Sequence, residues 1–334
     1  MPAYARLLEL LADALADKGL RARLGDAWSG RSFGGFYERP LLLLAALRDD
    51  ALAEGTRHPL WKAIGAERPR PEGLAPAPLA EALESDRLWA SLRARHVQTN
   101  ETSRAVAWLW PAALLASAAP GRTVGLFDIG ASAALNLVAD LLEPIWEREG
   151  GGALAVAPLP EVGARTGFDL RPLNVLDPAD ERWLRACVWP GESERLAQLE
   201  AAIAAFRRLA AAGAAPRLER SAARDIPPAM PTTAESLAIA FQTVVRDYLG
   251  EEERAAYETG MVEWLAASPP GLAIWVQLEL EASAETELPF GLTARVATGD
   301  GATDPISLAR CGPHPRRLRV DDGAVASFRA ALRP

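Results

Sequence analysis

The residues best placed for ligand chemistry follow a short apolar run that ends in an acid. Residues 122–128 read Arg-Thr-Val-Gly-Leu-Phe-Asp, and Gly130 and Ser132 follow among small residues. A strand that leads through a small-residue turn into a helix leaves room for a ligand against bare backbone, and the helix N-terminus offers N–H donors. In open α/β sheets, ligands lie at the carboxyl ends of the strands. We therefore expect a nucleotide-like ligand above Gly130, with Asp128 beside it.

Two further acids follow later candidate strands. Asp169 lies at the end of residues 165–170, and Asp225 comes just past residues 217–220. A carboxylate in such a place can accept two charge-assisted hydrogen bonds from hydroxyl groups. The alternative is that each acid, Asp128 included, only caps a helix or closes a turn. Only the order of the three acids along the chain favours a binding site.

A polar cluster stands before a very apolar helix and consists of Gln98, Thr99, Asn100, Glu101 and Arg104. Asn100 is a good N-cap, and Glu101 suits the first turn of a helix, so a purely structural cap is one interpretation. The number of polar groups exceeds what a cap requires. We therefore also expect the cluster to bind substrate, as a lid or wall over the ligand cleft.

Four later residues are candidates for catalysis, namely Gln242, Tyr248, Glu279 and His314. Gln242 and Tyr248 come after the fourth candidate strand, as wall residues of the cleft. Glu279 alternates with other acceptor side chains, and a carboxylate that faces a cleft can be a general base because burial raises its pKa. His314 lies in a rigid turn rich in proline and glycine. The alternatives are a solvated glutamate near a sheet edge and a structural histidine.

The number and positions of the lysines and cysteines exclude several kinds of site. Lys18 and Lys62 are the only lysines, and neither follows a glycine-rich loop, which excludes phosphate-loop and kinase-like proteins. Cys187 and Cys311 are far apart in sequence and lack paired Cys/His spacing, so we expect neither a metal site nor a disulfide. A reducing cytoplasm is the expected location.

Composition limits the partners of the chain. The 334 residues include 36 Lys and Arg against 44 Asp and Glu, a net charge of −8, so no extended nucleic-acid surface is expected. The apolar stretch 105–119 is shorter than the ~20 residues that span a bilayer and contains Pro111. Acids at positions 9 and 13 interrupt the N-terminus, which excludes a signal peptide there. We therefore expect no membrane partner; the oligomeric state stays open.

The elements that must position these residues change in character near residue 120. Before it, leucine spacing predicts helices over residues 4–24, 41–47 and 79–92. After it, candidate strands alternate with candidate helices. The strands are residues 122–128, 165–170, 217–220, 237–243, 272–280, 290–297 and 316–320, and the helices are residues 131–142, 180–188, 192–212 and 251–267.

This alternation predicts an α/β protein with a Rossmann-like, mainly parallel sheet and an antiparallel edge. The antiparallel edge follows because the last two strands have no helix between them. The predicted domains are a helical N-terminal region, 1–120, and an α/β domain, 121–334.

Residues 126–137 resemble the first motif of class I S-adenosylmethionine-dependent methyltransferases. Asp128, Gly130 and Ser132 match that motif, and Ala134 stands where its last glycine is usual. The resemblance implies that Asp128 and Gly130 meet the amino-acid end of the cofactor and that Asp169 accepts the ribose hydroxyls. It also implies that Asp225 takes the adenine amino group.

Nearly the whole chain also resembles the bacterial domain of unknown function 2332 family. The matching pieces are residues 97–101 with Arg104, residues 128–137, 165–173 and 188–190, and the pair Glu194-Arg195. This resemblance implies a methyltransferase-like fold and no particular activity.

We expect a protein that binds S-adenosylmethionine and transfers its methyl group to an acceptor that the sequence does not identify. Because the sulfonium is already activated, the protein mainly needs to align an in-line nucleophile of the acceptor and, for O or N acceptors, to remove its proton. One alternative is a non-catalytic Rossmann-like binding module, with the helical part as a partner surface. The other is an α/β-hydrolase that uses Ser132 with His314 and an acid such as Asp304.

Overall fold

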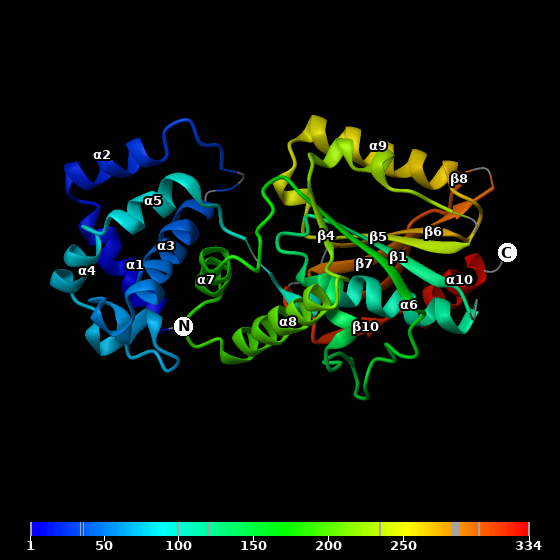
Figure 1. Cartoon of the computed structure of the whole chain (residues 1–334), viewed down its shortest axis with the longest axis horizontal. Coiled ribbons are helices and arrows are strands. Elements are labelled where there is room, and N and C mark those ends of the chain that lie inside the picture. Colours follow the sequence, from blue (N-terminus) through cyan, green and yellow to red (C-terminus); the bar gives the residue numbers. More distant parts are fainter. Residues whose placement is uncertain are drawn as a thin grey trace. The chain divides into compact units, whose positions relative to one another are not determined.

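The computed structural model of the protein describes residues 2–33, 35, 37–98, 100–118, 121–233, 235–281, 287–299 and 301–332. The chain forms two compact units (Figure 1). Unit 1 combines Met1–Thr99 with Asn174–Glu200, and unit 2 combines Asn100–Leu173 with Ala201–Pro334. The division between the units falls within helix α8 (Ser193–Ala211). A domain boundary near residue 120 stays a prediction.

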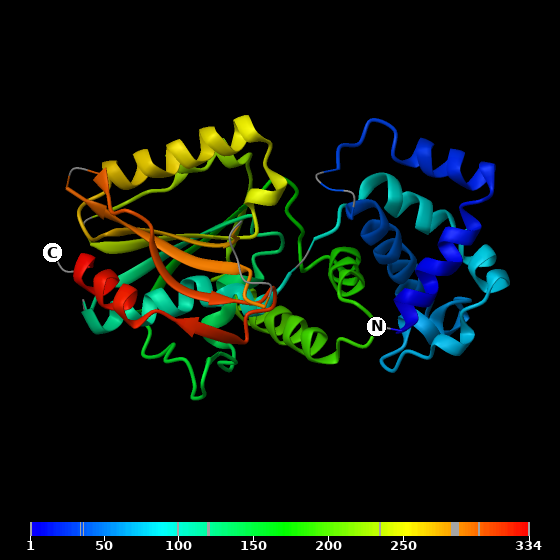
Figure 2. The ribbon, with the colours of Figure 1, turned by 180° about the vertical axis from the view of Figure 1, so that it is seen from behind.

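The described part of unit 1 is built from helices and turns (Figures 1 and 2). The α-helices are α1 (Pro2–Ala14), α2 (Lys18–Ala27), α3 (Glu38–Glu54), α4 (Pro76–Ala82), α5 (Asp86–Ala94), α7 (Pro178–Cys187) and the first part of α8. Short turns of 3-10 or π-helix are η1 (Gly55–Arg57), η2 (Trp61–Gly65) and η3 (Pro71–Gly73).

Helix α3 is the centre of unit 1, where it packs against α5 and α7. Its buried stretch includes three charged residues, and each has a partner inside the unit. Arg48 donates to the backbone carbonyl of Val188, Asp49 forms an ion pair with Arg182 at 2.8 Å, and Asp50 lies 3.3 Å from His58. Because buried charges are tolerated when they are paired, these groups explain how α3 crosses the core.

The described part of unit 2 contains a ten-stranded sheet. Its strands are β1 (Thr123–Ile129), β2 (Glu147–Arg148), β3 (Val162–Asp169), β4 (Arg217–Arg220), β5 (Ser236–Thr243), β6 (Ala273–Leu280), β7 (Phe290–Thr298), β8 (Gly301–Ala302), β9 (Ile306–Cys311) and β10 (Arg317–Val320).

The strand order is β2-β10-β9-β7-β6-β5-β1-β3-β4, with β8 paired to β7. Strands β4, β3, β1, β5 and β6 run parallel, whereas β7, β9 and β10 add to them in antiparallel fashion. The parallel part has the 3-2-1-4-5 order of doubly wound sheets. The prediction of an α/β protein with a mainly parallel sheet, an antiparallel edge and N-terminal helices is confirmed.

Helices cover both faces of this sheet (Figures 1 and 2). Helix α9 (Glu251–Ala267) lies on one face, and α6 (Val106–Ala118) and α10 (Asp322–Ala331) lie on the other. The remaining short helices are η4 (Thr102–Ala105), η5 (Leu135–Leu141), η6 (Ala223–Asp225), η7 (Pro227–Ala229) and η8 (Arg246–Tyr248). Central strands covered in this way are apolar on both sides, as the buried run of β5 illustrates.

Three predicted helices differ from the structure. Residues 4–24 form two helices because Asp17 caps the second by accepting from the Leu20 N–H at 2.7 Å. Ser85 likewise separates α4 from α5 within residues 79–92. Residues 131–142 form a turn and the 3-10 helix η5 rather than an α-helix, because the turn contains residues with positive φ. No helix among the described residues is long and apolar enough to cross a membrane.

Candidate functional site

The turn after β1 carries the polar residues that the sequence singled out. Gly130, Ser132 and Ala134 have φ values of 77°, 54° and 59°. A Cβ atom on Gly130 would lie 2.8 Å from a methyl carbon of Val245, so only glycine fits this position. Positive φ at a serine and an alanine costs about 1–2 kcal/mol each, and such strain concentrates at functional turns. The turn is therefore a candidate ligand site on its conformation as well as on its sequence.

The backbone N–H groups of Gly130, Ala131 and Ser132 already have hydrogen-bond partners. Those of Gly130 and Ala131 donate to the carbonyl oxygen of Phe168 at 2.8 and 3.0 Å. The Ser132 N–H donates to Oδ2 of Asp169 at 2.8 Å. These three N–H groups are therefore not free for a ligand, because β3 accepts their hydrogen bonds, and no α-helix begins at the turn.

Asp169, the last residue of β3, stabilises the turn by accepting backbone hydrogen bonds. Its second oxygen, Oδ1, accepts from the Arg171 N–H at 2.7 Å. A carboxylate has about four lone-pair sites, so two accepted hydrogen bonds leave acceptor capacity on this half-buried side chain. Asp169 can therefore hold the turn and still receive a donor from a ligand.

Asp128, in contrast, is buried and has one carboxylate oxygen without a hydrogen-bond partner among the described residues. The residue is 1% exposed, and its Oδ2 has no hydrogen-bond partner in the described part of the chain. Burial and, secondarily, the negative charge of Asp169 raise the pKa of Asp128 well above its usual range. A buried oxygen in this state favours a ligand that brings a donor or a positive charge.

The segment before α6 lies against this turn and against the turn after β9. Asn100 donates from Nδ2 to Oγ of Ser132 at 2.7 Å. Oε2 of Glu101 lies 2.6 Å from Nδ1 of His314, although 213 residues separate the two along the chain. Arg104 donates from Nε and Nη2 to the carbonyl oxygen of Pro313, at 3.3 Å each. The structure thus brings together three of the expected substrate-binding residues, Ser132 and His314.

Glu101 and His314 form a carboxylate–histidine pair. Glu101 is 3% exposed, and its Oε1 accepts from the Ser103 hydroxyl at 2.6 Å. The His314 side chain is 47% exposed. When His314 donates its Nδ1–H to Glu101, Nε2 carries the lone pair, which is the arrangement of a general base oriented by an acid.

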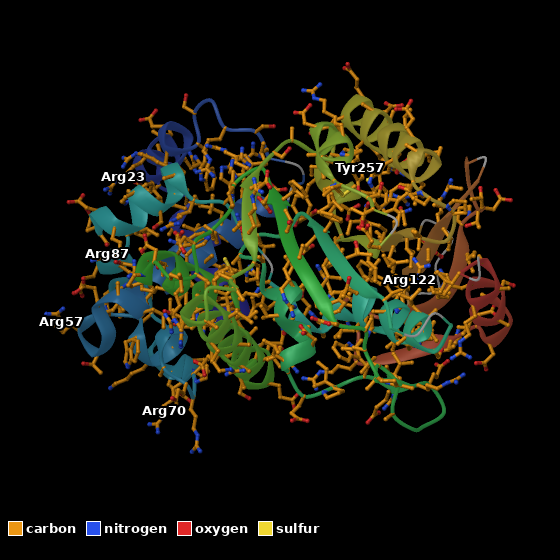
Figure 3. The ribbon with its side chains drawn as sticks, turned by 45° about the vertical axis from the view of Figure 1, so that its right-hand side comes forward. Arg23, Arg57, Arg70, Arg87, Arg122 and Tyr257 are labelled. Carbon is orange, nitrogen blue, oxygen red and sulfur yellow. The ribbon has the colours of Figure 1, made fainter. Side chains whose placement is uncertain are left out.

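Two of the expected catalytic residues lie in a closed network inside unit 2. Glu279 accepts from Nε2 of Gln242 at 2.6 Å and from the Val245 N–H at 3.0 Å. Oε1 of Gln242 accepts from the Tyr257 hydroxyl at 2.6 Å and from the Trp275 indole N–H at 3.0 Å. Tyr257, labelled in Figure 3, projects from α9. Burial raises the pKa of Glu279, but its oxygens have partners that hold the end of β5.

The other three expected residues lie on η8, on η6 and in unit 1. Tyr248 is 53% exposed on η8, and Asp225 is exposed on η6, which packs against α9. Gln98 belongs to unit 1, where its backbone hydrogen-bonds the Cys187 thiol. Thr99 lies outside the described residues.

Two polar groups of this region were missed by sequence reasoning. Ser103 supports Glu101, and the Val245 N–H supports Glu279, as given above. The Ser103 hydroxyl has a sequence signal, since it stands two residues after the acid. No sequence signal points to Val245, because it contacts Glu279 through its backbone N–H and not through its side chain.

Comparisons with known proteins identify the family and no activity. A search of curated proteins finds no match. A family model described as "Uncharacterized protein conserved in bacteria (DUF2332)" matches residues 1–319. Because this match covers nearly the whole chain, the protein belongs to the DUF2332 family.

Proposed function

We propose that this protein binds S-adenosylmethionine at the carboxyl ends of β1 and β3 and transfers its methyl group to an acceptor. The observation that carries the proposal is the chemistry of the site, which is rich in acceptors and poor in free donors. Oδ2 of Asp128 has no partner among the described residues, and Asp169 keeps acceptor capacity, whereas the N–H groups of residues 130–132 are occupied.

This chemistry distinguishes between nucleotide-like ligands. A phosphate needs N–H donors and positive charge, and two neighbouring carboxylates repel it. The ammonium group and the ribose hydroxyls of S-adenosylmethionine are donors, and its sulfonium is positive. The residues therefore fit this cofactor better than a dinucleotide.

The position in the sheet supports the same proposal. Strand β1 lies between β3 and β5, where the strand order reverses, and ligands of doubly wound sheets bind at this point. Asp128 would hold the ammonium group, with the backbone of Gly130 meeting the amino-acid end. Asp169 would receive the ribose hydroxyls. We extend the proposal to Asp225 for the adenine amino group.

The chain itself must manage the acceptor and its proton. The cofactor supplies an activated methyl group, so the protein needs to align a nucleophile and, for O or N acceptors, remove a proton. We assign the proton to Nε2 of His314, with Glu101 holding the imidazole and stabilising its charged form. Asn100 and Arg104 would form the wall on the acceptor side.

A hydrolase based on Ser132 receives less support. In the described chain Oγ of Ser132 accepts from Asn100, and no hydrogen bond joins it to His314. The carboxylate that contacts His314 is Glu101, while Asp304 is exposed.

Calorimetric titration with S-adenosylmethionine, S-adenosylhomocysteine and NAD⁺ tests the proposal. We expect saturable binding of the first two and none of NAD⁺. Asp128→Asn should weaken binding about tenfold or more, because it removes a charge-assisted contact. Asp304→Asn is the matched control and should bind as the wild type does.

Absence of binding at millimolar S-adenosylmethionine would overturn the proposal, as would tighter binding of NAD⁺. Labelling of Ser132 by a fluorophosphonate probe would instead support the hydrolase. Thermal unfolding of each variant shows whether a loss of binding reflects a loss of folding.

A further inference from the structure

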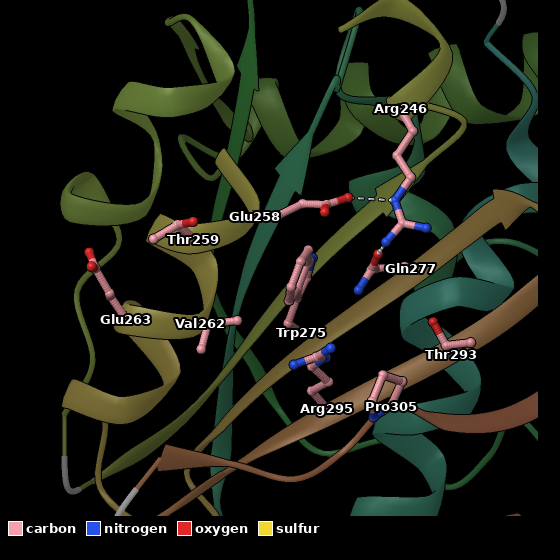
Figure 4. Close-up of a pocket in the computed structure, with 10 residues that line it drawn as sticks. All are labelled: Arg246, Glu258, Thr259, Val262, Glu263, Trp275, Gln277, Thr293, Arg295 and Pro305. Atoms are coloured by element: carbon pink, nitrogen blue, oxygen red, sulfur yellow. Dashed lines mark hydrogen bonds and ion pairs between the residues drawn. The ribbon is translucent and has the colours of Figure 1, made fainter. Parts of the chain in front are cut away.

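A cavity of about 500 Å³ lies in unit 2, on the face of the sheet that α9 covers (Figure 4). Two cross-strand pairs form one wall of the cavity. Trp275 of β6 lies opposite Arg295 of β7, and Gln277 lies opposite Thr293. Opposite residues of neighbouring strands project to the same face, so the indole, guanidinium, amide and hydroxyl groups share one wall.

The two arginines of this cavity differ in their partners. Arg246 is committed, because its Nε lies 2.9 Å from Glu258 and its Nη2 donates to Oε1 of Gln277 at 2.5 Å. The buried Nε of Arg295, like that of Arg246, has no hydrogen-bond partner in the described part of the chain, but no ion pair joins Arg295 to a described residue. Figure 4 shows the Arg295 guanidinium beside Trp275, with no interaction to the other residues drawn.

A buried guanidinium group without an ion-pair partner is energetically unfavourable. An anionic ligand that pairs with the Arg295 guanidinium would offset this cost. We propose that the cavity binds a small organic carboxylate, with its carboxylate on Arg295 and its flat or apolar body against Trp275. This proposal does not depend on S-adenosylmethionine, since neither Asp128 nor Asp169 lines the cavity.

Charge and size define the ligand class. A guanidinium fork suits carboxylate and phosphate alike, but Arg246 already pairs with Glu258, which it shares with Arg254, and Glu263 adds a carboxylate to the cavity wall. Among the lining residues, Arg295 is therefore the cation that can pair with a ligand. A single positive charge favours a monoanion over a dianion. The volume lies within the range of small-molecule sites, and the indole offers a surface for an aromatic ring.

The test uses benzoate as the probe, followed by calorimetry and by the NMR signal of the Trp275 indole N–H, which Trp275→Phe assigns. We expect a dissociation constant of about millimolar order for so small a ligand. Arg295→Gln should weaken binding about tenfold or more, and Arg295→Lys should have a smaller effect because it keeps the charge but loses the fork. Arg310→Gln, on the neighbouring strand β9, is the matched control and should leave binding unchanged.

Comparison ligands decide the class. Benzamide has the same shape without the charge and should bind at least tenfold more weakly. Equal affinity for benzamide, equal affinity of the folded Arg295→Gln variant, or no saturable shift of the Trp275 signal would overturn the proposal. Tighter binding of phenyl phosphate than of benzoate would overturn the carboxylate assignment.

Discussion

Asp128 and Glu279 are both buried carboxyl groups near the carboxyl ends of parallel strands, yet their surroundings are opposite. Glu279 lies in a network with Gln242, Tyr257 and the N–H of Val245. Asp128 has an oxygen without a partner in the described chain. Positive φ does not separate the two, since it occurs at Ser132 and Ala134 after β1 and at Val244 beside the Glu279 network. Burial and a raised pKa, which the two share, therefore do not identify a functional group by themselves. The state of the hydrogen-bond partners separates them.

The largest expected effect comes from removing Glu279, the buried carboxylate whose oxygens have hydrogen-bond partners. Glu279→Ala leaves the Gln242 amide and two backbone N–H groups without their acceptor, so unfolding should become easier by about 3 kcal/mol. Urea unfolding measures this loss. A change below about 1 kcal/mol would show that the network is not a unit of stability.

A smaller loss is expected from Tyr257→Phe. It removes one hydrogen bond to Gln242 but leaves the Trp275 donor in place, so the cost should be about 1 kcal/mol in the same urea experiment. Combining it with Glu279→Ala should give a cost lower than the sum, because both act on the same amide. Strict additivity would argue against the network.

A gain in stability is expected at the strained turn. Ala134→Gly relieves a left-handed alanine and should raise the free energy of unfolding by about 0.5–1 kcal/mol, despite the greater entropy of unfolded glycine. Ala139→Gly in η5 is the control and should lower it. A loss at position 134 would show that the alanine Cβ contributes packing that exceeds the strain.

The smallest expected change is that of Asp128→Asn below about pH 4, about 0.5 kcal/mol or less, because both side chains are then neutral and no hydrogen bond of Oδ2 is lost. The effect should appear in the pH dependence. A carboxyl group whose pKa is raised by folding binds more protons in the native state, so its contribution is full below about pH 4 and is lost as pH rises through the raised value.

Urea unfolding across pH should therefore show wild-type stability falling more steeply above about pH 4 than that of Asp128→Asn. Glu279 contributes with the same sign in both proteins, so the difference isolates Asp128. Parallel curves would contradict the raised pKa of Asp128.

Local sequence patterns predicted much of unit 2. The predicted helix 251–267 coincides with α9, and the predicted strands 237–243 and 290–297 differ by one residue from β5 and β7. Strand β9 and helix α10 were missed. Strand β9 is six residues long and interrupted by a serine and an arginine, so its short pattern resembles a loop.

The sequence by itself determined the alternation of strands and helices, the α/β class and the positions of Asp128 and Asp169 at the ends of strands. These features depend on neighbours within a few residues, where periodicity and turn chemistry act.

Only the tertiary structure decided which polar groups have partners. Glu279 meets a residue 37 positions away, and Glu101 meets one 213 positions away. It also decided that the N–H groups of residues 130–132, in the turn after β1, donate to Phe168 and Asp169. The physical reason is that a buried hydrogen bond joins groups that folding brings together, and no local pattern records which distant group arrives.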